Sequence, residues 1–440
     1  MSTISDDEHA FRLAGLELGV ATAPTQIEGH HRNSNWYDWA ERGRIKDNSS
    51  PDTAGDHWVR WREDTALLDD LGIRHYRMGL EWGRLEPLQD EYDEAAVQRY
   101  RDELLELRRF GIRPLVTLHH FSRPTWFESL GGFEHPDGVT YFLRFVRFVV
   151  ERFGDLVSDW ITINEPNVYV TGSYFSGIWP PGAHNWNSVV RVFNRLATAH
   201  ILAYELIHEL QPHATVGVAF HLRTFKPALA WNPWHHGLTR AVQYLFQEVI
   251  AEAMCTGTFL WPLRRPRGIR PGCYYDVIGI NYYSQSTISH FDDGTAVGVP
   301  VNDLGWEILP AGLVRVAEWA HRRYPAPIWI TESGTCDNAD RFRNRYIHDH
   351  LRAVVASGLS IERFYHWCFV DNWEWDEGRV PRFGLVHLDH RTMTRTVKDS
   401  GRFYAEIIAQ GGVTEEMYQR WVAHQRYPRN ANVIRRNPRL

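Results

Sequence analysis

Two stretches of the sequence share one design: Trp160-Ile161-Thr162-Ile163-Asn164-Glu165-Pro166 and Pro327-Ile328-Trp329-Ile330-Thr331-Glu332-Ser333-Gly334. Each starts with bulky and β-branched residues that are typical of a buried strand, and each then reaches a carboxylate. A carboxylate at the tip of a buried strand costs free energy unless it has a partner or a chemical task. Taken alone, Glu165 fits either a salt bridge to a neighbouring arginine or a functional group. The second copy of the design at Glu332 favours a functional pair.

Composition and charge exclude several classes of protein. Of 440 residues, 43% are hydrophobic, so a large core can form, and the net charge of −6 gives no basic surface for nucleic acid. The four cysteines, Cys255, Cys273, Cys336 and Cys368, have no Cys-x-x-Cys spacing, which indicates free thiols in a reducing compartment. No signal peptide and no apolar run of about 18 residues is visible. We therefore expect a soluble, cytoplasmic protein with no membrane partner.

Eight strand-like segments alternate with helical ones along the whole chain. Alternation of this kind indicates a parallel sheet, and eight units in series indicate an α/β fold with a closed (β/α)₈ TIM barrel. We expect one catalytic domain over residues 1–440, with a frayed, solvated C-terminal tail from about 413 to 440. The predicted strands are Leu16–Ala23, Arg74–Leu80, Arg113–His119, Trp160–Asn164, Thr215–Phe220, Tyr275–Asn281, Ile328–Thr331 and Arg363–Trp367. The predicted helices are 56–71, 93–110, 139–153, 188–210, 237–254, 310–323, 341–357 and 397–410.

The spacing of the units places the two carboxylates on one rim. Glu165 ends the fourth strand and Glu332 the seventh, and a barrel of this kind carries its active site at the C-terminal ends of its strands. Three long loops, at about 165–187, 282–309 and 368–396, would wall a pocket there. Two facing carboxylates with aromatic neighbours and no metal-ligand pattern fit glycoside hydrolysis, in which one acts as acid and the other as nucleophile or base.

Seven motifs, in order, resemble those of the family 1 glycoside hydrolases, which are retaining β-glycosidases on a (β/α)₈ barrel. The similarity runs from about Gly19 to about Phe403. The motifs are Ala23-Pro24-Thr25-Gln26-Ile27-Glu28-Gly29, Tyr76-Arg77-Met78, Val116-Thr117-Leu118-His119-His120, Thr162-Ile163-Asn164-Glu165-Pro166, Gly279-Ile280-Asn281-Tyr282-Tyr283, Ile330-Thr331-Glu332-Ser333-Gly334 and Trp367 with Asp371-Asn372-Trp373-Glu374-Trp375.

The resemblance implies a role for each matched position. Glu165 would be the acid/base and Glu332 the nucleophile, which Arg77 and Tyr283 would keep ionised. The residues that would bind the sugar are Gln26, His120, Asn164, Asn281, Tyr283, Trp367, Glu374 and Trp375. Neither a cofactor nor a metal ion is implied. The same resemblance implies a cis peptide bond between Trp367 and Cys368.

A few positions depart from the family pattern. Ser333 stands where the family commonly has Asn, Phe121 where it has Trp, and Cys368 where it has Ser. The stretch 255–274 matches the family pattern poorly and looks shortened. This difference affects one wall of the part of the site that would hold the aglycone, the leaving group of the glycoside.

The substrate expected from the resemblance is a neutral β-glycoside. Members that take phosphorylated sugars carry a Ser and a Lys in the strand-8 loop, and residues 373–383 contain neither. We expect β-glucosides first, with β-galactosides and β-fucosides as side activities. Two alternatives remain: a transglycosylase that uses the same covalent intermediate, and a sugar-binding barrel without catalysis. The sequence decides neither the aglycone nor the oligomeric state.

Overall fold

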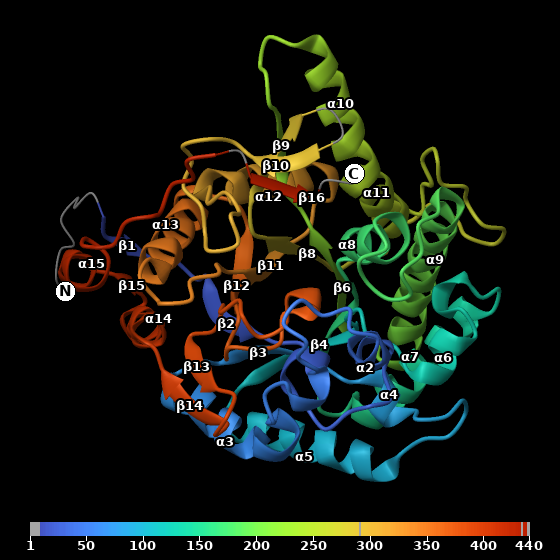
Figure 1. Ribbon diagram of the computed structural model, residues 1–440. Coiled ribbons are helices and arrows are strands. Elements are labelled where there is room, and N and C mark those ends of the chain that lie inside the picture. The colour runs from blue at the N-terminus through green and yellow to red at the C-terminus, as the bar shows by residue number, and fades with distance from the viewer. Residues whose placement is uncertain (1–8, 290–291, 433, 438–440) are drawn as a thin grey trace.

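Eight parallel strands close into a barrel within residues 9–289, 292–432 and 434–437, which this computed structural model describes (Figure 1). The order around the barrel is β11-β12-β2-β3-β4-β5-β6-β8, so the last barrel strand of the chain, β12, pairs with the first, β2. This is the predicted (β/α)₈ TIM barrel. Its strands are β2 (Glu17–Ala21), β3 (His75–Gly79), β4 (Arg113–His119), β5 (Asp159–Asn164), β6 (Thr215–His221), β8 (Val277–Tyr282), β11 (Ile328–Ser333) and β12 (Ile361–Trp367).

Helices surround the barrel, and each of the predicted strand–helix units is present with its ends shifted by a few residues (Figure 1). The long helices are α3 (His57–Asp70), α5 (Glu94–Arg109), α7 (Gly138–Phe153), α9 (Trp186–Leu210), α10 (Pro233–Gln243), which continues through the π-helical η4 (Tyr244–Glu248) into α11 (Val249–Thr256), α12 (Pro310–Arg323), α13 (Arg343–Ala356) and α14 (Asp399–Gln410). Helix α5 shows how the sequence sets the bounds. The Asp93 side chain caps its first turn, and Arg108 and Arg109 lie in its last turn, where cations are favoured.

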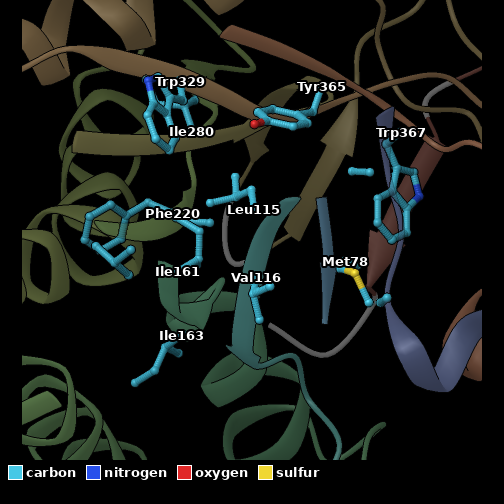
Figure 2. Close-up of a cluster of buried hydrophobic side chains, with 14 of the residues drawn as sticks. Met78, Leu115, Val116, Ile161, Ile163, Phe220, Ile280, Trp329, Tyr365 and Trp367 are labelled. Carbon is cyan, nitrogen blue, oxygen red and sulfur yellow. The ribbon is translucent and has the colours of Figure 1, made fainter. Parts of the chain in front are cut away.

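The barrel wall is buried on both faces, which is why its strands read as nearly continuous apolar runs. Leu115 and Val116 are both fully buried, although successive strand residues point to opposite sides. Figure 2 shows them with apolar side chains from strands β3, β5, β6, β8, β11 and β12 of the same barrel. The resulting core is rigid, and it fixes the positions of the polar residues at the strand ends.

Short elements fill the loops between the strands and the long helices. They are α1 (Pro24–Ile27), α2 (Asn35–Glu41), η1 (Pro51–Thr53), α4 (Trp82–Leu85), α6 (Thr125–Ser129), η2 (Gly132–Glu134), α8 (Pro166–Val170), the π-helical η3 (Thr171–Phe175), β7 (Thr224–Pro227), β9 (Gln285–Ser289), β10 (Asp292–Thr295), η5 (Trp375–Glu377), β13 (Val386–Asp389) and β14 (Thr394–Val397). All three loops that were expected to wall a pocket therefore carry regular structure.

The expectation of a frayed C-terminal tail is wrong for the described part of that segment. Strand β15 (Gly412–Val413) pairs with β1 (Phe11–Arg12), and α15 (Glu415–Trp421) follows. Met417, Tyr418 and Val422 are buried, because they form an apolar face between the arginines. Beyond them, the backbone of β16 (Ile434–Asn437) pairs with β10. The C-terminal segment therefore pairs with β1 near the N-terminus and with β10.

Two further expectations can be compared with the structure. The cysteines Cys255, Cys273, Cys336 and Cys368 are free thiols, as predicted. In the described part of the chain, no helix has both the length and the apolar character that crossing a membrane requires.

Candidate active site

Glu165 and Glu332 lie together at the C-terminal rim of the barrel, on the two strands that the unit count assigns to them. Glu332 is in register with Asn281 of the neighbouring strand β8. The Asn281 Nδ2 in turn donates hydrogen bonds to Glu165 Oε1 (2.9 Å) and to Asn164 Oδ1 (3.0 Å). One asparagine thus connects the strand tips of β5 and β11.

Glu332 is held by two charged or polar donors. The Arg77 Nη1 donates to its Oε1, and the Tyr283 hydroxyl donates to its Oε2 (2.6 Å). Arg77 also donates through Nη2 to Asn164 Oδ1 (2.6 Å), so it positions two site residues at once. Burial raises the pKa of Glu332 to about 7, against the lowering effect of Arg77, and a charged Glu165 raises it further. Burial therefore opposes the ionised state that the resemblance implies for Glu332.

Glu165 sits at a strained backbone position, with φ of 42°, immediately before helix α8. Its Oε1 accepts hydrogen bonds from Asn281 and from His221 Nδ1 (3.1 Å). Burial acts to raise the pKa of Glu165, and a cationic His221 lowers it below its usual value. However, the Arg223 Nε donates to His221 Nε2 (3.1 Å), and a ring nitrogen that accepts a hydrogen bond carries no proton. A neutral His221 removes the largest effect that lowers this pKa. Burial, which raises the pKa, is then opposed by the hydrogen bonds from His221 and Asn281 and by the charge of Arg77.

The two buried carboxyl groups interact: a charged Glu165 raises the pKa of Glu332, because like charges at one site oppose each other's ionisation. Arg77 contacts Glu332 directly, which favours the proton on Glu165. When Glu165 carries that proton, its charge no longer raises the pKa of Glu332, so Glu332 ionises more readily. Arg77 thus makes the two carboxyl groups unequal.

A second polar group lies at the other end of the site. Glu374 accepts hydrogen bonds from Trp367 Nε1 (3.2 Å) and from Gln26 Nε2 (3.2 Å). Burial raises its pKa to about 8, although the bond from Trp367 lowers it, and Glu332 contributes to the rise. The Gln26 Oε1 is buried and has no hydrogen-bond partner among the described residues. This end of the site offers both donors and acceptors to a polar ligand.

His120 completes the polar lining. Its Nε2 accepts a hydrogen bond from Asn164 Nδ2 (3.0 Å), and burial holds its pKa well below the ordinary range, so the ring is neutral with its proton on Nδ1. That buried Nδ1 has no partner in the described part of the chain. The ring stacks between Trp367 and Trp375, with centroids 6.0 Å away on each side. Aromatic faces beside unpaired polar atoms suit a sugar ring.

The three departures from the family pattern leave the carboxylate pair untouched. Ser333 Oγ hydrogen-bonds the Tyr346 hydroxyl (3.0 Å), and Cys368 Sγ donates to the Val370 carbonyl (3.1 Å). Phe121 has a φ of 66° and packs on Trp179, with ring centroids 5.0 Å apart. The peptide bond between Trp367 and Cys368 is cis, as predicted.

All eleven residues predicted to act at the site converge on this rim, together with two, His221 and Arg223, that were not predicted. His221 and Arg223 follow the apolar run of β6, and the predicted strand stopped at Phe220, one residue too early. The signal that identified Glu165 was present here too, since His221 is also a polar residue at the tip of a buried strand.

The chain is similar to known proteins over most of its length. The model for glycosyl hydrolase family 1 matches residues 11–266 and 272–413, and the interruption falls inside the poorly matching stretch 255–274. Beta-glucosidase A of Thermotoga maritima is 28% identical over 442 residues, covering 91% of this chain and 98% of that protein. The chloroplastic galactolipid galactosyltransferase SFR2 of Arabidopsis thaliana is 30% identical over 385 residues, covering 82% of this chain and 58% of that protein.

Solved structures lead to the same family. The β-glycosidase from Pyrococcus horikoshii superposes with a TM-score of 0.86 at 31% identity, covering 94% of this chain and 98% of that one. The match to the family model spans most of the chain, from strand β1 to strand β15, and includes both strand-tip carboxylates. The chain belongs to glycosyl hydrolase family 1 and is a glycoside hydrolase.

Proposed function

We propose that the protein is a retaining β-glycosidase that hydrolyses neutral β-linked glycosides, β-glucosides above all. The observation that carries this proposal is the asymmetry of the carboxylate pair: Arg77 and Tyr283 donate to Glu332, whereas neutral groups donate to Glu165. Such a pair supplies a nucleophile and an acid in one site. The four free cysteines support a cytoplasmic location.

In the first step, Glu332 attacks the anomeric carbon while Glu165 gives its proton to the glycosidic oxygen. The bond between carbon and leaving oxygen breaks, and the sugar becomes an ester of Glu332. Esterification removes the charge of Glu332, so the now ionised Glu165 can accept a proton from water. That water attacks the same carbon and releases Glu332. Asn164, His120, Gln26 and Glu374 would hold the sugar hydroxyls, and Trp375 would cover the ring.

The proposal is tested by replacing the nucleophile. We expect Glu332→Gly to abolish hydrolysis of 4-nitrophenyl β-glucoside and azide to restore turnover of 2,4-dinitrophenyl β-glucoside, giving the α-glycosyl azide. Azide can enter the space of the missing carboxylate, and Glu165 is unchanged. A wild-type protein without glycosidase activity on a panel of aryl β-glycosides, or a variant that azide fails to rescue, would contradict the mechanism. Preference for a 6-phosphoglucoside would contradict the neutral substrate.

Glycosyl transfer is the second candidate, because the similar Arabidopsis protein is named a galactolipid galactosyltransferase. Transfer needs the same ester of Glu332, with a sugar hydroxyl instead of water as the attacking group. Product analysis with aryl β-glucoside or β-galactoside and added galactose or glycerol acceptors separates the two. A disaccharide or glycosyl glycerol as the main product would favour the transferase, and free sugar would favour the hydrolase.

A further inference from the structure

His221 contacts Glu165 and also packs on the tyrosine that donates to Glu332. It is the last residue of β6, and its side chain is almost fully buried. One ring nitrogen, Nδ1, lies 3.1 Å from Glu165 Oε1. The ring also stacks on Tyr283, with centroids 5.9 Å apart and planes 14° apart, and Tyr283 donates to Glu332. His221 therefore contacts Glu165 directly and is connected to Glu332 through Tyr283.

Arg223 determines which ring nitrogen of His221 carries the proton. Its Nε donates to His221 Nε2, and its Nη1 donates to Asp293 Oδ2 (2.9 Å) and Ser286 Oγ (3.2 Å). The guanidinium also lies over the Phe246 ring, 4.8 Å from its centroid. A guanidinium stays protonated and can only donate, so His221 Nε2 must accept. The single ring proton is then on Nδ1, where it points to Glu165.

Two hydrogen bonds consequently fall on the same oxygen of Glu165. Oε1 accepts from His221 Nδ1 and from Asn281 Nδ2, so it acts as the carbonyl-like oxygen of the protonated carboxyl. The acidic proton is left to Oε2. We propose that His221, fixed by Arg223, is a positioning residue that reserves Oε2 of Glu165 for the proton and directs it to the leaving group. This inference rests on the proposed glycosidase function.

The same contacts act as the proton leaves. In the first step the O–H bond of Oε2 breaks, a new O–H bond forms on the leaving oxygen, and the carbon–oxygen bond of the glycoside breaks. Negative charge then develops on the Glu165 carboxylate, where hydrogen bonds from His221 and Asn281 become charge-assisted and stronger. The effect of these hydrogen bonds on the rate depends on the leaving group. A basic leaving group such as an alkoxide must be protonated as it departs, whereas a weakly basic one such as dinitrophenolate need not be.

Two substitutions at position 221 separate this role from packing. His221→Phe keeps an aromatic ring against Tyr283 but removes the N–H group that donates to Glu165. His221→Asn places an amide Nδ2 near the position of Nδ1 and so keeps a donor to Glu165. The readout is kcat/KM for octyl β-glucoside and for 2,4-dinitrophenyl β-glucoside, with kcat and KM also determined separately. The ratio kcat/KM covers substrate binding and the first chemical step and excludes the second. We expect His221→Phe to lower the octyl value about 10- to 100-fold and the dinitrophenyl value less than about 3-fold. His221→Asn should stay within about 5-fold of the wild type on both.

The outcomes distinguish the inference from the function on which it rests. Equal losses on both substrates, or a loss only through KM, would assign His221 to packing or to aglycone contact and overturn the inference. No glycosidase activity in the wild-type protein would instead overturn the proposed function. Should His221→Phe fail to fold, Arg223→Met provides a second test. It frees Nε2 to take the ring proton, so we expect a loss of about 3- to 10-fold confined to the octyl substrate, and no selective loss would overturn the inference.

Discussion

Arg77 shows how a single side chain sets the chemistry of this site. It is fully buried, and it donates to Glu332, to Asn164 Oδ1 and to the Thr331 carbonyl. A buried guanidinium is costly unless its hydrogen bonds are satisfied. Here they are satisfied by Glu332, the proposed nucleophile, and by Asn164, which the resemblance assigns to the sugar. The arginine thus lowers the pKa of Glu332 and aligns Asn164 at the same time.

We predict that Arg77→Met moves the acid limb of the pH profile to higher pH. Glu332 must be ionised to attack, so kcat/KM falls as the pH drops through the pKa that Glu332 has while Glu165 is protonated. This pKa lies below the value of about 7 to which a charged Glu165 contributes. Loss of the Arg77 charge removes an effect that lowers this pKa, so the limb shifts upward. The measurement is kcat/KM against pH on 2,4-dinitrophenyl β-glucoside, and we expect an additional loss of about 100- to 1000-fold at the optimum.

Arg77→Lys is the matched control, since it keeps a positive charge but cannot make all the bonds of the guanidinium. It should shift the acid limb less than Arg77→Met does. An acid limb at the wild-type position in Arg77→Met would contradict the electrostatic role.

The sequence predicted most of the site at this scale, and the exceptions have physical reasons. Polar residues that follow a buried strand, such as Glu165 and Glu332, contrast strongly with their neighbours and are visible in the chain. His221 has the same contrast but follows a strand without a recognised motif, so it was missed. The pKa of Glu332 depends on how loops from distant parts of the chain bury it, and no local pattern records that.

At the scale of helices and strands, a buried ionic cluster joins helices α3 and α5. His57, at the start of α3, bonds Asp64 Oδ2 through Nδ1 (2.8 Å) and Glu103 Oε1 of α5 through Nε2 (2.9 Å). Burial alone would lower the pKa of His57, but the carboxylates of Glu103 and Asp64 raise it to about 9. The protonated ring therefore ties α3 to α5 at neutral pH.

We predict that His57→Gln lowers the free energy of unfolding, and that the difference from the wild type depends on pH. The folded pKa of about 9 exceeds the usual 6.5, so the charged imidazole stabilises the fold fully below pH 6.5. This stabilisation is lost as the pH rises through 9. We expect a deficit of about 3 kcal/mol at pH 6 that shrinks towards pH 10.

Urea unfolding followed by circular dichroism at both pH values measures this difference. The exposed His213→Gln serves as the control and should leave the stability unchanged at either pH. A deficit for His57→Gln of equal size at pH 6 and pH 10 would assign the effect to packing and contradict the charge.

At the scale of the whole molecule, the closed barrel explains why strand order in the sequence was enough to find the site. Every barrel strand ends at the same rim, so Glu165 and Glu332 meet although three strand–helix units separate them. The C-terminal segment has no such rule. Its apolar residues are few and lie between arginines. Whether they become buried depends on the positions of α13 and β1 in the folded protein, which the local sequence does not reveal.

That segment leads to a prediction about the closure of the chain. Tyr418 is buried between the two ends of the protein: its ring stacks on His9, with centroids 3.9 Å apart, and lies 4.9 Å from His348 of α13. The Arg345 Nη2 also donates to its hydroxyl (3.4 Å). We expect Tyr418→Ala to lower the free energy of unfolding by about 3 kcal/mol, the cost of removing a buried aromatic ring.

The exposed Glu416→Ala, two residues earlier on the same helix, is the control and should change stability by less than about 0.5 kcal/mol. Thermal and urea unfolding measure both variants, and kcat/KM on an aryl β-glucoside measures the site. Because α15 lies on the outside of the barrel, away from the tips of β5 and β11 (Figure 1), Tyr418→Ala should keep its kcat/KM at 25 °C. A Tyr418→Ala protein as stable as the wild type would contradict this prediction. It would mean that the packing of the C-terminal segment against the N-terminal residues contributes nothing to stability, as expected of a solvated tail.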